Sequence, residues 1–367
     1  MNETKAGIEP KNFAIRQAAK RCAGASILSK VIIEVTLLCN LKCLHCYVEP
    51  YHNEPQTKEL TATEWSRIFK QLFEMGIWHI TFSGGEPLCR PDIYEIMNHA
   101  KEQGFFFGLK TNGTLITKPI ADRLKEIGFS RVDVSIYGSR AKTHDYVTGV
   151  PGSYDKAIRA IKLLRERKIG VNIKTSIMKF NIDEKQEMEK ISRELDAYYD
   201  PDPLVFDKIG QPGSADNIRP EDEQLRTFFK EAKWTTNTVD FEEADLGNRL
   251  ICNAGRKTCN ISPQGEVFPC ALWRVPLGDL KQQNFRDIWY GEAASNIRAI
   301  KAKDMQHCAS CELLAYCSRC MGMASMENGD ILGPSSENCR LARILKGVID
   351  DRRKETVRQP RYRVGKS

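Results

Sequence analysis

The amino-acid sequence predicts an α/β protein with a parallel β-sheet, followed by a smaller region that is rich in cysteine. Two observations predict the sheet: strand and helix signals alternate from residue 31 to about residue 207, and a short polar or glycine-rich motif follows each of the first four strands. Repeated β–α units fold with right-handed crossovers, which place their strands parallel in one sheet. The second region is predicted from residues 251–340, which hold eight cysteines, many turns and few strong strand signals.

Six apolar runs predict the strands of the sheet. In chain order they are Val31–Thr36, His79–Ser83, Phe105–Lys110, Val132–Ile136, Val171–Ile177 and Leu204–Asp207. The first helix between them is expected to begin at a capping box formed by Thr61 and Glu64 and to end at Gly76. Further helices are expected from about Pro91 to Gly104, from Pro119 to Gly128, from Ser153 as N-cap to about Lys168, and near residues 221–232.

Four motifs follow the first four predicted strands. They are Cys39–Cys46, Ser83–Pro87, Thr111–Gly113 and Tyr137–Gly138. Because functional sites of parallel sheets form at the carboxyl ends of the strands, we expect all four motifs to lie on one rim. This convergence places the candidate site of the protein there.

The composition is that of a soluble globular protein, with 41% hydrophobic and 28% charged residues in a chain of 367. No stretch has the unbroken apolar length of a membrane span, and residues 1–30 lack the apolar core of a signal peptide. We therefore expect a cytoplasmic protein without a membrane partner. Thirteen cysteines in such a reducing compartment indicate metal binding rather than a disulfide framework.

The net charge of +7 is concentrated at the C-terminus. Residues 352–367 contain seven Lys or Arg residues and one acid, so this tail carries +6 of the +7 and leaves +1 for residues 1–351. The folded part therefore lacks the basic surface that is typical of nucleic-acid binding, and nucleic acid is not an expected partner. We expect the tail to be solvated and mobile.

Cys39, Cys43 and Cys46 lie in the loop after the first strand with the spacing C-x3-C-x2-C. Thiolates on short loops hold iron–sulfur clusters, normally with four thiolates for a cubane cluster. Three thiolates would leave one iron open to a substrate or cosubstrate, as the open position of a catalytic zinc is. A zinc site with His45 as fourth ligand is the alternative, but His45 lies between two of the cysteines, where its side chain cannot easily turn back onto their metal.

This spacing resembles the signature of the radical S-adenosylmethionine (SAM) superfamily. The resemblance implies a partial (β/α)6 TIM-like barrel whose open iron binds the amino and carboxylate groups of SAM. It also implies that reduction of the cluster splits SAM into methionine and a 5′-deoxyadenosyl radical. His45 occupies a position that usually carries an aromatic residue near the adenine of SAM.

Gly84-Gly85-Glu86-Pro87 resembles the GGEP motif of the same superfamily, which hydrogen-bonds the amino group of SAM. Asn112 and Ser135 match polar positions that in relatives face the ribose and carboxylate of SAM. The resemblance thus implies a cofactor-binding role for Gly84, Gly85, Glu86, Pro87, Asn112 and Ser135 beside His45. Taken alone, Gly-Gly and Asn-Gly are also ordinary turn pairs.

The C-terminal cysteines resemble those of the SPASM domain, which carries two auxiliary [4Fe–4S] clusters. The resemblance implies ligand sets of Cys252, Cys259, Cys270 and Cys320 for the first cluster and Cys308, Cys311, Cys317 and Cys339 for the second. The central run is C-x2-C-x5-C-x2-C here, whereas the family has three residues before the last cysteine. Two structural zinc sites would satisfy the same sets of four. Three clusters together would use eleven cysteines and leave Cys22 and Cys89.

The expected domains are an N-terminal extension (residues 1–28), a radical SAM core (29–210), a connector (211–250), a SPASM domain (251–345) and a basic tail (346–367). The resemblance implies hydrogen abstraction from a ribosomally made peptide during its maturation. Modification of a small molecule or tetrapyrrole is the first alternative, and a non-catalytic iron–sulfur electron-transfer module is the second.

The expected partners are the peptide and a flavodoxin or ferredoxin reductant. A separate peptide-recognition protein is also expected, because fewer than 35 residues precede the first strand, too few for an independent core. Ala271 follows Cys270, where sulfatase-type maturases carry an aspartate that serves as a general base. We therefore expect a reaction other than formylglycine formation.

Overall fold

The computed structural model describes residues 28–48, 58–231, 252–305 and 307–358. Within these residues one sheet has nine strands in the order β6-β5-β4-β3-β2-β1-β7-β8-β9. The strands are β1 (Lys30–Thr36), β2 (His79–Gly84), β3 (Phe106–Thr111), β4 (Arg131–Ser135), β5 (Gly170–Ser176), β6 (Tyr198–Asp202), β7 (Thr258–Ile261), β8 (Glu266–Phe268) and β9 (Gly278–Asp279). β1 to β6 pair in parallel with their neighbours, and β6 and β9 remain as the two edges, so the barrel is open.

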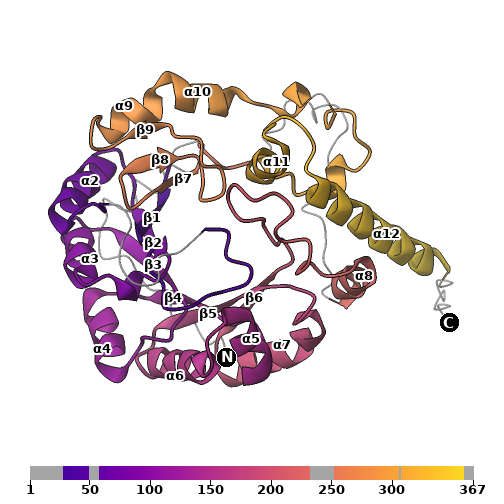
Figure 1. The fold of residues 1–367 in the computed structure, drawn as a ribbon, viewed down its shortest axis with the longest axis horizontal. Helices are drawn as coiled ribbons and strands as arrows, with labels where there is room; N and C mark the ends of the chain where they lie inside the picture. Colours follow the sequence, from indigo (N-terminus) through magenta and orange to yellow (C-terminus); the bar gives the residue numbers. More distant parts are fainter. Residues whose placement is uncertain (1–27, 49–57, 232–251, 306, 359–367) are drawn as a thin grey trace, which may run out of the picture.

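Helices cover the outside of the curved sheet, as Figure 1 shows for α2, α3, α4, α6 and α7. The helices are α2 (Ala62–Glu74), α3 (Ile93–Glu102), α4 (Lys118–Ile127), α5 (Ala141–Thr148), α6 (Ser153–Glu166), α7 (Lys185–Glu194), α8 (Asp222–Glu231), α9 (Phe285–Tyr290), α10 (Glu292–Ala299), α11 (Met321–Asn328) and α12 (Ser336–Arg358). The predicted capping box is present, since the Thr61 side chain accepts from the Glu64 N–H and Glu64 accepts from the Thr61 N–H.

Alternation along the strands separates an apolar outer face from a polar inner one. Ile33, Phe82 and Val134 are fully buried between the sheet and the helices. Lys110 and Asp133 occupy the alternate positions, paired across β3 and β4, and face the inside of the barrel. The predicted α/β fold with a partial barrel and a cysteine-rich C-terminal region is therefore confirmed, and its lumen is polar.

Two local predictions are wrong, and one helix was not predicted. Leu204–Asp207 is a loop rather than a strand, because the sixth strand lies earlier, at Tyr198–Asp202, and Pro203 directly follows it. The apolar residues 204–206 then line a cavity. α5, a short helix between β4 and α6, has no counterpart among the predicted helices. Gly152 rather than Ser153 is the N-cap of α6, and the Asp145 carboxylate accepts hydrogen bonds from the backbone N–H of Gly152 and Tyr154.

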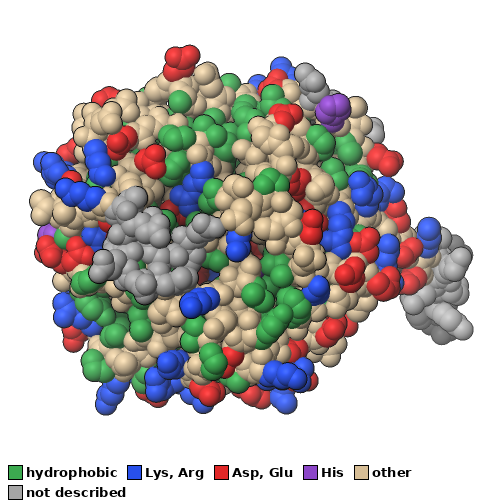
Figure 2. All heavy atoms as spheres, viewed as in Figure 1, with side chains coloured by type: hydrophobic (Ala, Val, Ile, Leu, Met, Phe, Trp, Pro, Cys, Tyr) green, Lys and Arg blue, Asp and Glu red, His purple; other side chains and the backbone are tan. Residues whose placement is uncertain are grey.

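The C-terminal region continues the sheet of the barrel instead of forming a separate one. β7 pairs in parallel with β1, and β7, β8 and β9 then form an antiparallel meander. The predicted mobile tail is wrong in part, because α12 extends to Arg358, and Arg352 donates to the Phe229 and Lys230 carbonyls of α8. None of the described helices combines the length and apolarity that a membrane span requires. Figure 2 shows Lys and Arg interspersed with Asp and Glu over the visible face.

Candidate active site

A cavity of about 260 Å³ opens at the carboxyl ends of β1 to β5, where the sequence motifs were expected to meet. It is lined by Cys39, Leu41, Cys43, His45, Cys46, Tyr47, Ser83, Gly84, Gly85, Lys110, Thr111, Asn112, Ser135, Tyr137, Ser176, Leu204, Val205 and Phe206. Residues from all four predicted motifs are among them. The structure therefore brings the three cysteines, the glycine pair, Asn112 and Ser135 to one cavity.

Each of the three cysteines in the loop after β1 is half-buried and lines this cavity. Burial is the main cause that raises the pKa of Cys39 to about 12, and nearby carboxylate and thiolate groups raise it further. Burial likewise raises the pKa of Cys43 and Cys46, and Cys46 and Cys39 add to the effect on Cys43. Three buried thiolates are unfavourable together unless a cation compensates them, which is the role of a bound metal cluster.

The cysteine chemistry fits an iron–sulfur cluster. All twelve cysteines within the described ranges are free of disulfides. Across those same ranges, no three His, Cys, Asp or Glu side chains are grouped as ligands of one metal ion. A cubane cluster does not need such a group, because each thiolate binds a different iron.

Backbone hydrogen bonds fix the cysteine loop to the C-terminal end of α5. The Lys42 N–H donates to the Thr148 carbonyl at 2.8 Å, and the Leu44 N–H donates to the Val147 carbonyl at 2.9 Å. Behind the loop, the His45 ring meets the Tyr137 ring edge-on with centroids 4.3 Å apart. Burial lowers the pKa of His45 to about 4, so its imidazole is neutral at pH 7.

Gly84 and Gly85 allow the end of β2 to approach the cysteine loop closely. The Gly85 N–H donates to the Thr36 carbonyl at 2.9 Å, and the Glu86 N–H donates to the Leu38 carbonyl at 2.7 Å. A Cβ atom would lie 2.0 Å from the Thr36 oxygen at position 84 and 2.4 Å from the Leu38 oxygen at position 85. Neither position therefore has room for a side chain.

Glu86 is fully buried and connects the ends of β2 and β3. Its carboxylate accepts from the Thr111 hydroxyl at 2.9 Å and from the N–H groups of Asn112 and Leu88 at 2.7 and 3.1 Å. Burial raises its pKa to about 7, although these hydrogen bonds act in the opposite direction. Glu86 and Pro87 do not line the cavity, so Glu86 positions Asn112 from within the wall.

Asn112 and Ser135 both line the cavity, as expected from the sequence. The Asn112 side chain donates to the Asn40 side-chain oxygen at 2.9 Å and accepts from the Thr114 hydroxyl at 2.6 Å. Asn40 in turn donates to Thr114 at 2.8 Å. This polar triangle connects the end of β3 to the residue directly after Cys39.

Sequence reasoning missed the charged lumen below this cavity, which forms a second cavity of about 480 Å³. Its lining is Lys110, Asp133, Ser135, Tyr137, Lys174, Thr175, Ser176, Asp200, Pro201 and Asp202. Lys174 pairs with Asp200, and Asn172 donates to Asp133 at 2.8 Å. Alternation in the predicted strands is the signal that could have found part of this lining, because Asp133, Ser135 and Tyr137 occupy every second position along and just after β4.

The eight C-terminal cysteines fall into two neighbourhoods, with one exception. Cys270 and Cys252 interact electrostatically with Cys320, and Cys308, Cys311 and Cys339 interact with Cys317. Cys259 is instead fully buried on β7, opposite Val31, within the apolar core. Burial alone raises the pKa of Cys259. The structure therefore places seven of the eight in groups that match the predicted ligand sets and leaves Cys259 apart.

The remaining two cysteines have different surroundings. Cys89 is half-buried in the turn after the glycine motif, and burial raises its pKa to about 11. It lies near enough to Cys39 to raise the pKa of that thiol. Cys22 lies outside the described residues.

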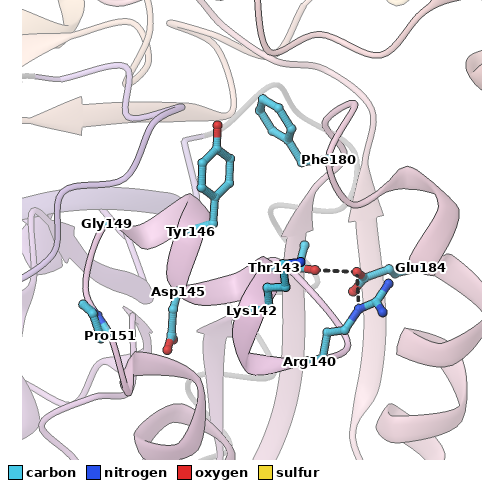
Figure 3. Close-up of a pocket in the computed structure, with 9 residues that line it drawn as sticks. All are labelled: Arg140, Lys142, Thr143, Asp145, Tyr146, Gly149, Pro151, Phe180 and Glu184. Carbon is cyan, nitrogen blue, oxygen red and sulfur yellow. Dashed lines mark hydrogen bonds and ion pairs between the residues drawn. The ribbon is translucent and has the colours of Figure 1, made fainter.

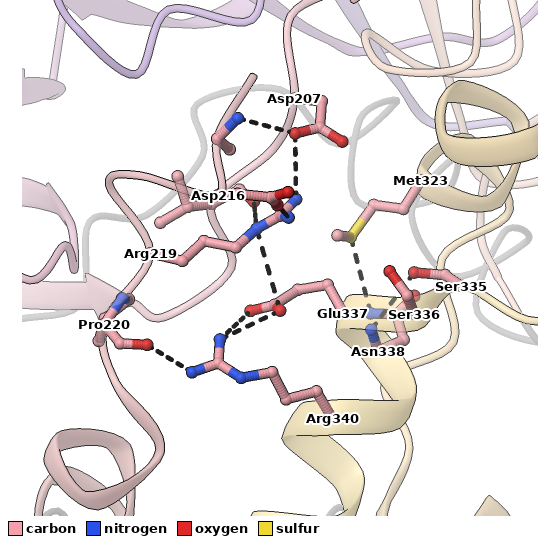
Figure 4. Close-up of polar contacts among 12 residues, drawn as sticks. Asp207, Asp216, Arg219, Pro220, Met323, Ser335, Ser336, Glu337, Asn338 and Arg340 are labelled. Carbon is pink, nitrogen blue, oxygen red and sulfur yellow. Dashed lines mark hydrogen bonds and ion pairs between the residues drawn. The ribbon is translucent and has the colours of Figure 1, made fainter. Parts of the chain in front are cut away.

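Two ion-pair networks attach the cysteine-rich region to the barrel. Arg274, four residues after Cys270, makes two hydrogen bonds of 2.8 and 2.6 Å to Glu34, which is buried on the inner face of β1. In the second network, Arg219 from the loop after β6 contacts Asp207 at 3.3 Å and Glu337 of α12 at 3.9 Å (Figure 4). Arg340 pairs with Glu337 at 3.2 Å, two residues before the predicted ligand Cys339.

Family models match both parts of the chain: the radical SAM superfamily matches residues 33–195, and the SPASM iron–sulfur cluster-binding domain matches residues 252–312. The AdoMet-dependent heme synthase of Methanosarcina barkeri is 31% identical over an alignment that covers 82% of this chain and 93% of that protein. The PqqA peptide cyclase of Bradyrhizobium diazoefficiens is 27% identical over 77% of this chain and 78% of that protein. The mycofactocin maturase MftC of Mycolicibacterium smegmatis is 26% identical over 83% of this chain and 81% of that protein.

Solved structures share the fold at low sequence identity. SuiB of Streptococcus suis bound to S-adenosylmethionine has a TM-score of 0.68 at 19% identity over 89% of this chain and 81% of SuiB. Native anSMEcpe with bound AdoMet has a TM-score of 0.68 at 17% identity over 89% of this chain and 98% of that one. These structures show the fold, and the heme synthase relative and the two family models establish that the chain belongs to the radical SAM superfamily of enzymes, with a C-terminal SPASM domain and with [4Fe–4S] clusters and SAM as its cofactors.

Proposed function

We propose that this enzyme binds a SAM-coordinating [4Fe–4S] cluster at Cys39, Cys43 and Cys46 and abstracts a hydrogen atom from a ribosomally made peptide. The observation that carries the proposal is that three cysteines, the glycine pair and two polar strand ends converge on one cavity, whose lining includes no fourth cysteine of the described residues. When bound, the reduced cluster and SAM supply an organic radical that can remove hydrogen from an unreactive C–H bond.

The roles of the chain's own residues follow from their positions. The three thiolates hold the cluster, and the Lys42 and Leu44 backbone bonds keep their loop against α5. Gly84 and Gly85 present their backbone to the cavity, and Asn112 and Ser135 offer polar side chains to SAM. The neutral His45 ring meets the Tyr137 ring edge-on, and both rings form part of the cavity wall.

The C-terminal cysteines are proposed to hold two auxiliary [4Fe–4S] clusters. The domain boundaries predicted from the sequence, with the SPASM domain at residues 251–345, are part of this proposal. Seven of the eight predicted ligands lie in two matching neighbourhoods, which supports both clusters. The first site would need Cys259 to leave the core, or a different fourth ligand. The enzyme is also proposed to act in the cytoplasm.

A peptide is the substrate class that the lumen supports best. Lys110, Asp133, Lys174, Asp200 and Asp202 make the lumen next to the SAM cavity charged. Such a surface suits a hydrated peptide segment better than the broad apolar faces of a porphyrin ring. The names of two relatives, a PqqA peptide cyclase and a mycofactocin maturase, also support a peptide. A separate recognition protein is proposed to present it.

A tetrapyrrole is the second candidate, and a specific observation favours it. The heme synthase relative has 31% identity over 93% of its length, compared with 27% over 78% for the PqqA peptide cyclase. Lys110 provides a cation that could bind a propionate, since its side chain has no hydrogen bond or ion pair with another described residue. The two candidate functions differ in the molecule that loses the hydrogen atom, which is a tetrapyrrole in one and a peptide in the other.

An anaerobic assay separates these possibilities. The reconstituted enzyme, dithionite and SAM are expected to yield 5′-deoxyadenosine, and the variant with all three loop cysteines changed to alanine is the matched control. A deuterated precursor peptide encoded beside the gene is expected to transfer deuterium into 5′-deoxyadenosine. Transfer from a deuterated porphyrin instead would establish the second candidate, and no 5′-deoxyadenosine in any mixture would refute the proposed chemistry.

A further inference from the structure

The cysteine loop has an inner and an outer side. Leu41, Cys43 and His45 line the cavity, whereas the alternating residues Lys42 and Leu44 do not. Leu44 is 38% exposed, although it directly follows a predicted cluster ligand. Within the part of the chain that the structure describes, an apolar side chain adjacent to Cys43 therefore reaches the surface.

A surface groove of about 730 Å³ lies over α5 beside this exposed point of the loop. We name the α5 face by six residues: Lys42, Leu44, Lys142, Tyr146, Lys179 and Phe180. Tyr146 is 57% exposed and its ring lies 5.1 Å from that of Phe180, with both rings projecting to the same side in Figure 3. The residue after Tyr146 accepts the Leu44 backbone bond, so the aromatic pair and the loop are continuous.

The charges of this face are unbalanced toward positive. Lys42, Lys142 and Lys179 form no ion pair with any other residue in the described part of the chain. The two acids of the groove are occupied: Glu184 accepts from Ser139, Thr143 and Arg140, and Asp145 accepts from the start of α6. Three lysines that form no ion pair within the described residues therefore accompany the aromatic pair, and Lys179 lies over the Phe180 ring at 5.3 Å from its centroid. Aromatic side chains with a polar rim are typical of protein-binding patches.

We propose that the α5 face is the docking site of a small acidic electron carrier of the flavodoxin class. The reduced flavin of this partner loses one electron, and the cluster held by the three loop cysteines gains it, with no transfer of atoms. Charge complementarity selects an acidic partner and accelerates its association. The site is close to the cluster because Leu44 adjoins Cys43 and its backbone is bonded to α5, which carries the groove. This proposal is independent of the substrate.

The first test measures binding without turnover. Calorimetric titration of the reconstituted enzyme with a flavodoxin at low ionic strength compares wild type with the double variant Lys142→Glu/Lys179→Glu. Two charge reversals at a rim are expected to weaken binding about tenfold and to flatten its dependence on salt. The control is Lys70→Glu, an exposed lysine on α2, a helix that lies away from α5 in Figure 1, and this variant is expected to bind like wild type.

The second test compares two reductants for 5′-deoxyadenosine formation from SAM alone. Flavodoxin-supported formation is expected to fall about tenfold in the double variant, whereas dithionite-supported formation stays at the wild-type rate. Equal binding and equal flavodoxin-supported rates in both proteins would overturn the proposal and place electron entry elsewhere, such as at the cysteine-rich region. If iron content falls in the double variant, Lys142→Gln/Lys179→Gln replaces it, and unchanged flavodoxin affinity in that variant would overturn the proposal equally.

Discussion

Gly85→Ala is expected to disable the SAM site while the rest of the fold survives. The new Cβ would lie 2.4 Å from the Leu38 oxygen and 2.7 Å from the Leu37 oxygen, both backbone atoms of the loop that leads to Cys39. A normal carbon–oxygen contact needs roughly 3.2 Å, so the loop or the end of β2 must move by about 0.8 Å. This shift would also strain the 2.9 Å bond from the Gly85 N–H to Thr36.

The size of the effect follows from this displacement. Overpacking of this kind costs about 1–3 kcal/mol of folding free energy, which a domain of this size tolerates. A displacement near 1 Å at a catalytic site costs about 100-fold in rate. We therefore expect 5′-deoxyadenosine formation to fall about 100-fold and the iron content to fall by up to one cluster, about four irons per chain.

Gly108→Ala is the matched control for this variant. Gly108 lies on β3 in the same lumen, but its nearest neighbour would be 3.8 Å from the new Cβ, an ordinary contact. It should retain iron and SAM cleavage within about twofold of wild type, given the small cost of Gly-to-Ala changes at compatible positions. Equal SAM cleavage by the two variants would refute the argument that the glycine motif exists to seat the cysteine loop.

Three other outcomes are expected. Changing all three loop cysteines to alanine should abolish SAM cleavage and lower the iron content from on the order of twelve to about eight per chain, whereas zinc in place of the remaining iron would contradict the auxiliary clusters. Arg274→Met should lower the free energy of unfolding by about 3–5 kcal/mol in anaerobic denaturant titration, because it leaves Glu34 buried without a partner. The double variant Glu34→Met/Arg274→Met should recover most of this loss. Equal destabilisation of the single and double variants would show that the ion pair is not the cause. Because Ala271 cannot act as a base, a cysteine-containing sulfatase peptide should not be converted efficiently to formylglycine, and efficient conversion measured by mass spectrometry would contradict this expectation.

The barrel could be predicted because local signals agree with the global fold. The first five predicted strands match β1 to β5 to within one residue at either end, since each alternates apolar residues toward the helices. The sixth was displaced because Leu204, Val205 and Phe206 form an apolar run that reads as a buried strand. These side chains line the active-site cavity. An apolar run that is needed to line a cavity therefore has the same sequence pattern as a buried strand.

The candidate site could be predicted in its chemistry but not in its surroundings. Closely spaced cysteines and a Gly-Gly pair after a strand can be recognised in the sequence, because both are defined by residues that lie a few positions apart. Lys110 and Asp133 were missed because their roles depend on which face of a strand turns inward, and both read as ordinary surface charges. The burial of Cys259 in the core depends on the pairing of β7 with β1, a contact between distant segments that no local pattern contains.

The pairing of β1 with β7 has a consequence for folding during synthesis on the ribosome. The partner of Lys30 in β7 is Thr258, so about 230 residues must be added after β1 emerges before this side of the strand can be covered. At roughly 5–20 residues per second, this delay is on the order of 10–50 s. During that time the nascent chain presents an open strand edge close to the three loop cysteines. Expression at low temperature with abundant chaperones and iron–sulfur assembly factors should therefore raise the yield of intact enzyme more than a stronger promoter does.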